Sequence, residues 1–243
     1  MTAIPALDWG RVDCARYERA LATEGFFAPE EGELLMRVLQ SAGPGCRALE
    51  VGSYRGRSAL FALAALPAGG RLIGVDAFID AAGYAGHSAP DLARRVGDDR
   101  FTVIEATLAQ AWDAVAAAPC DVALVDADHS FAGASADLAL AVALLRADGT
   151  LLVHDVADWF PGVVAAVGAL VRAGVLAELE RVESLCAFEV VRRPRWLTVP
   201  AVDHGEELPS PLDAASTPLG ARLGGGRAQI VFAAREERDT RSE

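Results

Sequence analysis

The sequence predicts an α/β fold, a doubly wound and mostly parallel sheet with helices on both faces and an antiparallel last strand. Short apolar runs alternate with alanine-rich segments from residue 47 onward, turn residues separate them, and 52% of the 243 residues are hydrophobic. Strands that alternate with helices pair in parallel, because each helical crossover returns the chain to the same end of the sheet. A chain of this length forms one large domain, or one domain with an appendage.

The elements follow from periodicity and from turn residues. Residues 1–44 are expected to be helical, because Pro29 followed by two glutamates is typical of a helix start and 33–40 is amphipathic. The apolar runs then predict strands at 47–51, 71–76, 101–105, 121–126 and 150–154. The segments between them predict helices at 57–66, 89–96, 108–117, 132–145 and 160–173. Residues 176–191 are apolar on either side of Glu183-Ser184, which predicts two strands.

The character of the chain changes after residue 192. Prolines and a run of three glycines punctuate 193–243, and periodicity is weak there. We therefore divide the chain into a domain over 1–192 and a C-terminal extension over 193–243, of unknown role. Residues 228–234 are able to form one strand, and the charged tail 235–243 is expected to be frayed.

The composition excludes several classes of protein. A net charge of −12 argues against a nucleic-acid partner, because phosphate binding needs a basic surface. The four cysteines show no metal-ligand spacing, and reduced structural thiols are the expected state. The N-terminus lacks the layout of a signal peptide, and no apolar run is long enough to span a membrane. We expect a cytoplasmic protein without a membrane partner; a homo-oligomer remains open. The chain contains no lysine, so no lysine acts as a base.

The segment from Ala48 to Asp76 is the most informative part of the chain. It consists of a strand, a turn bracketed by Gly52 and Gly56, a helix, a second strand and then a single acid. A sharp turn at a helix start is expected to present unpaired backbone N–H groups to a nucleotide-like ligand, and an acid at the end of the next strand accepts ribose hydroxyls.

Three motifs at strand ends resemble the class I S-adenosylmethionine-dependent methyltransferases. They are EVGSYRGRS at 50–58, VALVDADHSF at 122–131 and LLRADGTLLVHD at 144–155. The sequence is similar to the catechol O-methyltransferase-like enzymes and to the bacterial enzymes that modify antibiotics and sugars. The resemblance covers about residues 25–192 and implies a Rossmann-like fold, S-adenosylmethionine as cofactor and a small-molecule acceptor, such as a secondary metabolite or a sugar.

The resemblance also implies a set of cofactor-binding residues. Glu50 would hold the ammonium group or orient the turn, Ser58 would donate to the carboxylate, and Asp76 would accept from the ribose. Thr107 matches the position that contacts the adenine. The complete expected set is Glu50, Gly52, Ser53, Tyr54, Gly56, Ser58, Asp76, Thr107 and Asp126.

The catalytic residues expected from the resemblance are His129 and Asp126. His129 lies three positions after Asp126, where relatives place the general base, and an imidazole is able to accept a hydroxyl proton near neutral pH. Asp126 and Asp155 would hold Mg²⁺ or another divalent cation, although Val156 stands where metal-dependent relatives have a third oxygen ligand. Asp128 or a water is a possible substitute; alternatively, both aspartates only bond to backbone at the strand ends.

The remaining histidines and aromatic residues are less specific signals. His154 directly precedes Asp155, so on a regular strand its side chain is expected to point away from that carboxylate. His87 is expected in the loop 79–90, where it would be able to touch substrate, and His204 in an exposed part of the extension. Trp112 is expected to be a packing residue, whereas Trp159 and Phe160 either line an acceptor pocket or pack in the core.

Three alternative functions stay open. The same fold binds S-adenosylmethionine in enzymes that perform other chemistry on natural products. A non-catalytic binding subunit is a second alternative. An NAD-dependent dehydrogenase is the third, although the spacing Gly52-x-x-x-Gly56 departs from G-x-G-x-x-G.

Overall fold

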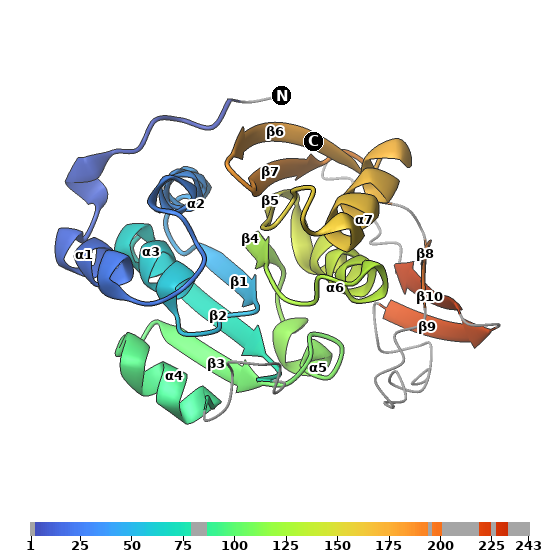
Figure 1. Cartoon of the computed structure of the whole chain (residues 1–243), viewed down its shortest axis with the longest axis horizontal. Coiled ribbons are helices and arrows are strands. Elements are labelled where there is room, and N and C mark those ends of the chain that lie inside the picture. The colour runs from blue at the N-terminus through green and yellow to red at the C-terminus, as the bar shows by residue number, and fades with distance from the viewer. Residues whose placement is uncertain (1–2, 79–86, 194–195, 201–218, 225–226, 233–243) are drawn as a thin grey trace, which may run out of the picture.

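The main sheet of the molecule has seven strands in the order β3-β2-β1-β4-β5-β7-β6 (Figure 1). The computed structural model describes residues 3–78, 87–193, 196–200, 219–224 and 227–232. The strands are Arg47–Val51 (β1), Arg71–Asp76 (β2), Phe101–Glu105 (β3), Cys120–Val125 (β4), Leu145–Val153 (β5), Leu176–Val182 (β6) and Leu185–Val190 (β7). The pairings among β1 to β5 are parallel, and β7 runs antiparallel to both β5 and β6. This confirms the predicted fold class.

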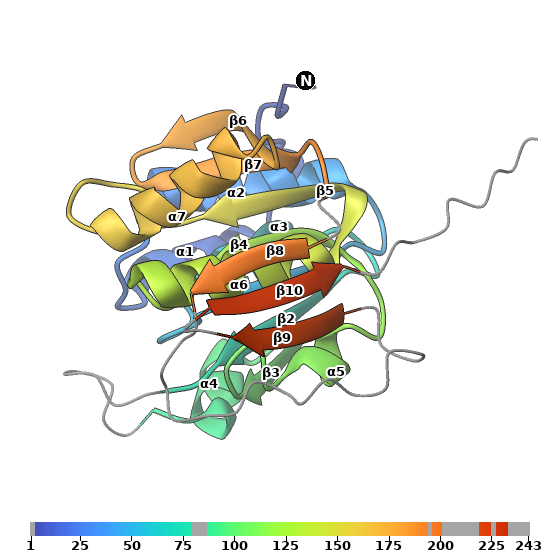
Figure 2. The ribbon, with the colours of Figure 1, turned by 90° about the vertical axis from the view of Figure 1, so that its right-hand side faces the viewer.

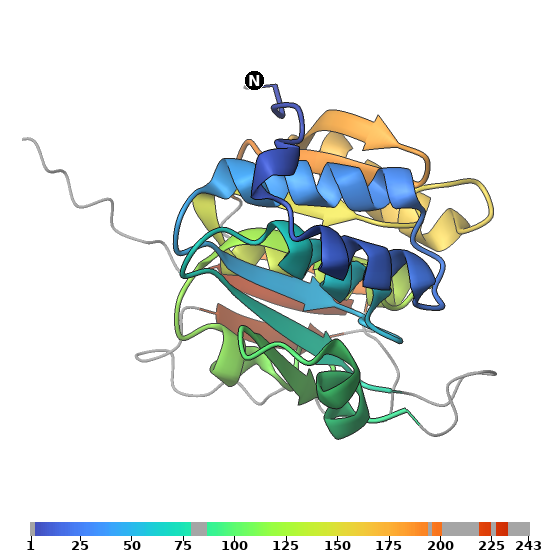
Figure 3. The same ribbon diagram turned by 90° about the vertical axis from the view of Figure 1, so that its left-hand side faces the viewer.

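Helices cover both faces of this sheet. On the face seen in Figure 3 lie α1 (Cys14–Ala22), α2 (Pro29–Ala42) and α3 (Arg57–Ala65), and α4 (Ala89–Val96) joins their apolar cluster. The second cluster contains α5 (Trp112–Val115), α6 (Phe131–Leu144) and α7 (Pro161–Arg172). The central strands are buried on both sides, which explains why they appear in the sequence as continuous apolar runs rather than as alternating ones.

Two helix predictions were too long. Among the described residues 3–44, only a 3₁₀ turn at Trp9–Arg11, α1 and α2 are helical. The Asp13 carboxylate caps α1 by accepting from the N–H of Arg16 at 3.1 Å, so a new helix starts there. The helix expected at 108–117 is reduced to α5, because Thr107 and Gln110 exchange side-chain to backbone hydrogen bonds and form a separate turn first.

Strand β5 begins five residues earlier than expected, at Leu145 instead of residue 150. Its pairing with β4 is irregular between Cys120 and Val122, where the register shifts. Asp148 and Gly149 in this stretch resemble turn residues, so the sequence did not indicate a strand there.

The C-terminal extension contains a second sheet. Strands β8 (Trp196–Pro200), β9 (Leu219–Gly224) and β10 (Arg227–Phe232) pair antiparallel in the order β8-β10-β9. Figure 2 shows this sheet in front of α6, with which β8 and β10 are in contact. The strand expected at 228–234 corresponds to β10, and the other two strands were not predicted. The tail 235–243 and His204 lie outside the described residues, and the division at residue 192 stays a prediction.

Gly52 determines how the carboxyl ends of β1 and β4 fit together. Its φ angle is +85°, and a Cβ atom at this position would lie 1.9 Å from the carbonyl oxygen of Asp126. The turn after β1 is thus in direct contact with the end of β4. Because β1 is the point where the strand order reverses, this contact lies where doubly wound sheets bind their ligands.

We expect Gly52→Ala to be far more destabilising than Gly45→Ala. Gly45 has a φ angle of +75° but no atom within 4 Å of its missing Cβ, so alanine there incurs only the backbone strain of about 1–2 kcal/mol. At Gly52 the clash with Asp126 adds about 1–3 kcal/mol. Urea denaturation of both variants measures the difference, and equal losses of stability would contradict the contact.

Candidate functional site

The turn after β1 is closed by the carboxylate at the end of β2. Asp76 Oδ2 accepts from the backbone N–H groups of Ser53 at 2.8 Å and Tyr54 at 2.9 Å, and Asp76 Oδ1 accepts from the N–H of Phe78 at 2.7 Å. The expectation that the N–H groups of this turn are unpaired was therefore wrong for Ser53 and Tyr54. Asp76 fixes the turn in the shape that a ribose would meet, and its oxygens still have room for further donors.

Glu50 lies beneath the same turn. Its Oε2 accepts from the Ser53 hydroxyl at 2.5 Å, whereas its Oε1 is buried and has no hydrogen-bond partner among the described residues. Burial raises the pKa of Glu50 to about 7, although the hydroxyls of Ser53 and Ser58 oppose the shift. Glu50 thus orients the turn, and its unpaired oxygen is suited to accept from a cationic or hydroxyl-bearing ligand.

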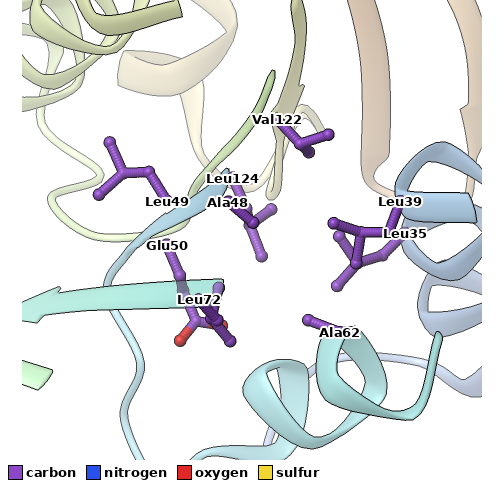
Figure 4. A pocket seen from close by; sticks show the side chains of 9 residues that line it. All are labelled: Leu35, Leu39, Ala48, Leu49, Glu50, Ala62, Leu72, Val122 and Leu124. Atoms are coloured by element: carbon purple, nitrogen blue, oxygen red, sulfur yellow. The ribbon is translucent and has the colours of Figure 1, made fainter. Parts of the chain in front are cut away.

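The cavity beside Glu50 is not the ligand site. It is about 10 Å³ in volume, which is the room of one water molecule at most. Figure 4 shows it enclosed by apolar side chains of α2, α3 and the central strands, with Glu50 at its border; the lining residues are Leu35, Leu39, Ala48, Leu49, Glu50, Ala62, Leu72, Val122 and Leu124.

Other members of the expected cofactor set surround this turn. Gly56 begins α3 with a φ angle of +85° and lies against α4, and Ser58 is buried in the first turn of α3. Thr107 is in the exposed turn after β3, where its N–H donates to Gln110 Oε1 at 2.9 Å. The Tyr54 ring stacks on Phe26 at 5.9 Å and lies 5.7 Å from the ring of His87. His87 therefore borders the turn after β1.

A compact cluster of charged groups occupies the ends of β4 and β5. His129 Nε2 lies 2.9 Å from Asp155 Oδ2 and 4.0 Å from Asp126 Oδ1. His154 Nδ1 lies 3.2 Å from Asp126 Oδ1 and 3.4 Å from Asp155 Oδ2. The two carboxylates that the sequence places at these strand ends are thus brought together with two imidazoles.

The expectation for His154 was wrong. Its side chain points towards Asp155 instead of away from it, because Asp155 has a φ angle of +60° and ends the alternation of the strand. A left-handed conformation in a residue other than glycine costs about 1–3 kcal/mol and is typical of functional sites. The ring of His154 is 3% exposed and stacks on Phe27 at a centroid distance of 4.9 Å.

Sequence reasoning missed Glu31, the third carboxylate of the cluster. It lies in α2, and its Oε2 is 3.0 Å from His154 Nε2. Glu31 is itself held firmly, because Oε1 accepts from the N–H and the hydroxyl of Ser184 and Oε2 accepts from the N–H of Ala28. The motif Pro29-Glu30-Glu31 only indicated a helix start; a partner 123 residues away leaves no local signal.

Electrostatics favour positive charge at the centre of this cluster. Burial lowers the pKa of His154, but Asp126, Asp155 and Glu31 outweigh it and raise the pKa to about 12. For Asp155 burial acts in the opposite direction and raises the pKa. The neighbouring His129 and His154 outweigh this effect and hold the pKa of Asp155 below its ordinary value. The carboxylates therefore attract either the imidazole proton of His154 or a divalent cation that would displace this proton.

A divalent cation fits these residues. Asp126, His154 and Asp155 each offer one ligand atom, and the three atoms lie within 4.8 Å of one another. His154 Nδ1 is buried and makes no hydrogen bond of acceptable geometry despite its carboxylate neighbours. Asp128 is not part of this group, because it accepts from the N–H of Ser130 and its carboxylate lies against Gly133 of α6. Val156 is buried and offers no ligand atom, as expected.

The aromatic residues near the cluster have different roles. Phe160 stacks on His129 at a centroid distance of 4.1 Å and restricts the imidazole. Trp159 is 69% exposed, which excludes core packing for that residue, whereas Trp112 is buried in the core as expected. Among the described residues no helix combines the length and the hydrophobicity that a membrane crossing needs.

Comparisons with known proteins agree with this geometry. Residues 49–156 match a family model described as "Methyltransferase domain". No curated protein sequence matches the chain. An O-methyltransferase from Bacillus cereus, solved in complex with SAH, superposes with a TM-score of 0.55 at 18% identity over 72% of this chain and 90% of that chain.

Two further solved structures come from antibiotic pathways. The O-methyltransferase TomG from Streptomyces achromogenes, involved in tomaymycin synthesis, gives a TM-score of 0.52 at 19% identity over 76% of this chain and 91% of that chain. The methyltransferase MycE from the mycinamycin biosynthetic pathway, in complex with Mg and SAH, gives a TM-score of 0.54 at 18% identity over 73% of this chain and 54% of that chain.

At these identities the structural matches show the fold, and the family model identifies residues 49–156 as a methyltransferase domain. The predicted resemblance is confirmed over residues 49–156: the chain contains a methyltransferase domain there, with the fold of O-methyltransferases, and this supports the predicted S-adenosylmethionine-dependent methyltransferase.

Proposed function

We propose that the protein transfers the methyl group of S-adenosylmethionine to a hydroxyl of a small molecule, with His129 as the general base. The observation that supports it most is the contact of the turn after β1 with the end of β4. Because Gly52 lies against Asp126, a methyl donor bound by the turn would be next to the cluster that contains His129.

The reaction needs no covalent enzyme intermediate. The acceptor oxygen attacks the methyl carbon as the sulfur–carbon bond breaks, and the hydroxyl proton passes to His129, which leaves a methyl ether and S-adenosylhomocysteine. The contact with Asp155 raises the pKa of His129 against the effect of burial, because the carboxylate stabilises the imidazolium that forms. Phe160 keeps the ring in place during the transfer.

Asp126, His154 and Asp155 would hold a divalent cation. Such a cation, when bound, polarises the acceptor hydroxyl and lowers its pKa. The strongly negative chain favours a small acceptor over a nucleic acid, and the antibiotic-pathway neighbours make a secondary metabolite or a sugar the substrate class to test first. A cytoplasmic location and a homo-oligomer stay predictions.

His129→Ala should lower the turnover number by about 10²–10⁴-fold, because the hydroxyl loses its proton acceptor. Release of S-adenosylhomocysteine from a panel of phenols, sugars and hydroxylated antibiotics measures it. The affinity for S-adenosylmethionine should stay within about threefold of that of the unchanged protein, since His129 is not in the turn after β1. Unchanged turnover would show that His129 is not the base.

Asp76→Asn should weaken the binding of S-adenosylmethionine by about 10–100-fold, because the amide removes a charged acceptor of the ribose and of the turn. Glu105→Gln is the matched control, since Glu105 is the acid directly opposite Asp76 on β3. Titration calorimetry compares the two variants. Equal losses would contradict the role of Asp76.

Product analysis separates the proposal from other chemistry on the same fold. Methyl transfer yields a methylated acceptor and S-adenosylhomocysteine in equal amounts. A product that forms without gaining a methyl group would favour the alternative of non-methylating chemistry, and a cofactor that binds without turnover on any acceptor would favour a binding subunit.

A further inference from the structure

We propose that His154 Nδ1 is the third protein ligand of the divalent cation, that Glu31 is the positioning residue for this imidazole, and that the nitrogen donor makes the site prefer a transition-metal ion over Mg²⁺. The inference rests on the proposed function for the place of the cation in the reaction. The binding of the cation itself depends only on the residues of the cluster.

The distances from His154 Nδ1 to the two carboxylates are close to those between neighbouring ligands of one cation, and all three donor atoms lie within 4.8 Å of one another. His154 Nδ1 lies 3.2 Å from Asp126 Oδ1 and 3.4 Å from Asp155 Oδ2. Neighbouring ligands of an octahedral cation with bonds of about 2.1 Å are about 3 Å apart. The observed distances exceed this spacing by a few tenths of an ångström, which small side-chain rotations would close.

The direction of the imidazole supports a shared centre. Although Nδ1 lies near two carboxylate oxygens, it forms no hydrogen bond with either, because neither oxygen is aligned with the ring nitrogen. An unsatisfied polar atom in a side chain that is 97% buried is costly unless another partner is provided. Three donors that lie within 4.8 Å of one another, with the imidazole nitrogen left without a hydrogen bond, suit a shared cation.

Glu31 decides which ring nitrogen is available. If Nε2 carries the proton and donates it to Glu31 at 3.0 Å, then Nδ1 presents its lone pair to Asp126 and Asp155. Histidine ligands of metals commonly donate their second nitrogen to a carboxylate in this way. The hydrogen bonds from Ser184 and Ala28 to Glu31, together with the stacking of Phe27, fix the ring before a cation arrives.

The nitrogen donor changes the expected metal. Mg²⁺ prefers oxygen ligands and keeps several waters, whereas imidazole suits Zn²⁺, Co²⁺, Ni²⁺ and Fe²⁺. A divalent cation also supplies one positive charge more than a proton on His154 against the three carboxylates around this imidazole. His154 therefore distinguishes this chain from a site built from oxygen ligands alone.

The test uses the full chain stripped of metal with a chelator and then titrated with Mg²⁺ or Co²⁺ in a calorimeter. We expect one site per chain that binds Co²⁺ at least about tenfold more tightly than Mg²⁺. In the variant His154→Asn, which offers an oxygen instead, this preference should shrink by about tenfold. Mn²⁺-loaded protein should also show a nitrogen coupling in electron spin echo spectra, which His154→Asn removes.

Glu31→Gln tests the positioning role. It keeps the shape of the side chain but removes its charge, and it should weaken Co²⁺ binding by about 10–100-fold while leaving the nitrogen coupling in place. Glu30→Gln, in the same turn of α2, is the matched control and should bind Co²⁺ like the unchanged protein, because among the described residues it is Glu31 that pairs with His154.

Several outcomes would overturn the inference. They are no bound cation in the unchanged protein, an equal or greater affinity for Mg²⁺, or no nitrogen coupling with Mn²⁺. The first would mean that a permanent His154 imidazolium takes the place of the cation. All three measurements are made on the unchanged protein, so they do not depend on whether a variant folds. Because none requires an acceptor or S-adenosylmethionine, failure here would leave the methyl transfer to be judged separately by the calorimetry with S-adenosylmethionine.

Discussion

The site depends on the parallel pairing of β1 with β4 and β4 with β5, which brings three strand ends to one edge of the sheet. At that edge the missing side chain of Gly52 allows the turn after β1 to lie against the backbone of Asp126. The contact between Gly52 and Asp126 therefore places two kinds of functional group side by side. The turn supplies backbone and carboxylate groups suited to an adenosyl ligand, and the ends of β4 and β5 supply groups that accept a proton or hold a cation.

Charge at this edge is arranged around two imidazoles, of which only that of His154 is buried. His129 is half-exposed and contacts Asp155, which is the arrangement expected of a base that must reach an acceptor. His154 is fully enclosed between Glu31 and the two aspartates, where it cannot contact an acceptor but can organise the carboxylates. Two histidines in one cluster thus have different roles, set by exposure and by their partners.

Much of this could be predicted from the sequence, because it depends on local patterns. The strands β1, β2 and β3, and the helix α4, lie where apolar runs and turn residues predicted them. The positions of Asp126 and Asp155 at neighbouring strand ends follow from the topology. The sequence could not show the direction of His154, since that depends on the left-handed backbone of Asp155, nor the role of Glu31, whose partner is brought near only by folding. Strand β8 of the C-terminal sheet was missed for the same reason, because its partner β10 is distant along the chain. Strand β9 is adjacent to β10 and was missed because the periodicity of this region is weak.

The central claim is that the methyl donor and the proton acceptor share this edge of the sheet. A crystal structure of the protein with S-adenosylhomocysteine tests it most directly. The claim predicts the ribose at Asp76, the amino acid portion beside Glu50 and the turn after β1, and the sulfur atom facing the side of the cluster where His129 lies. A ligand bound elsewhere, or one whose sulfur points away from His129, would contradict it.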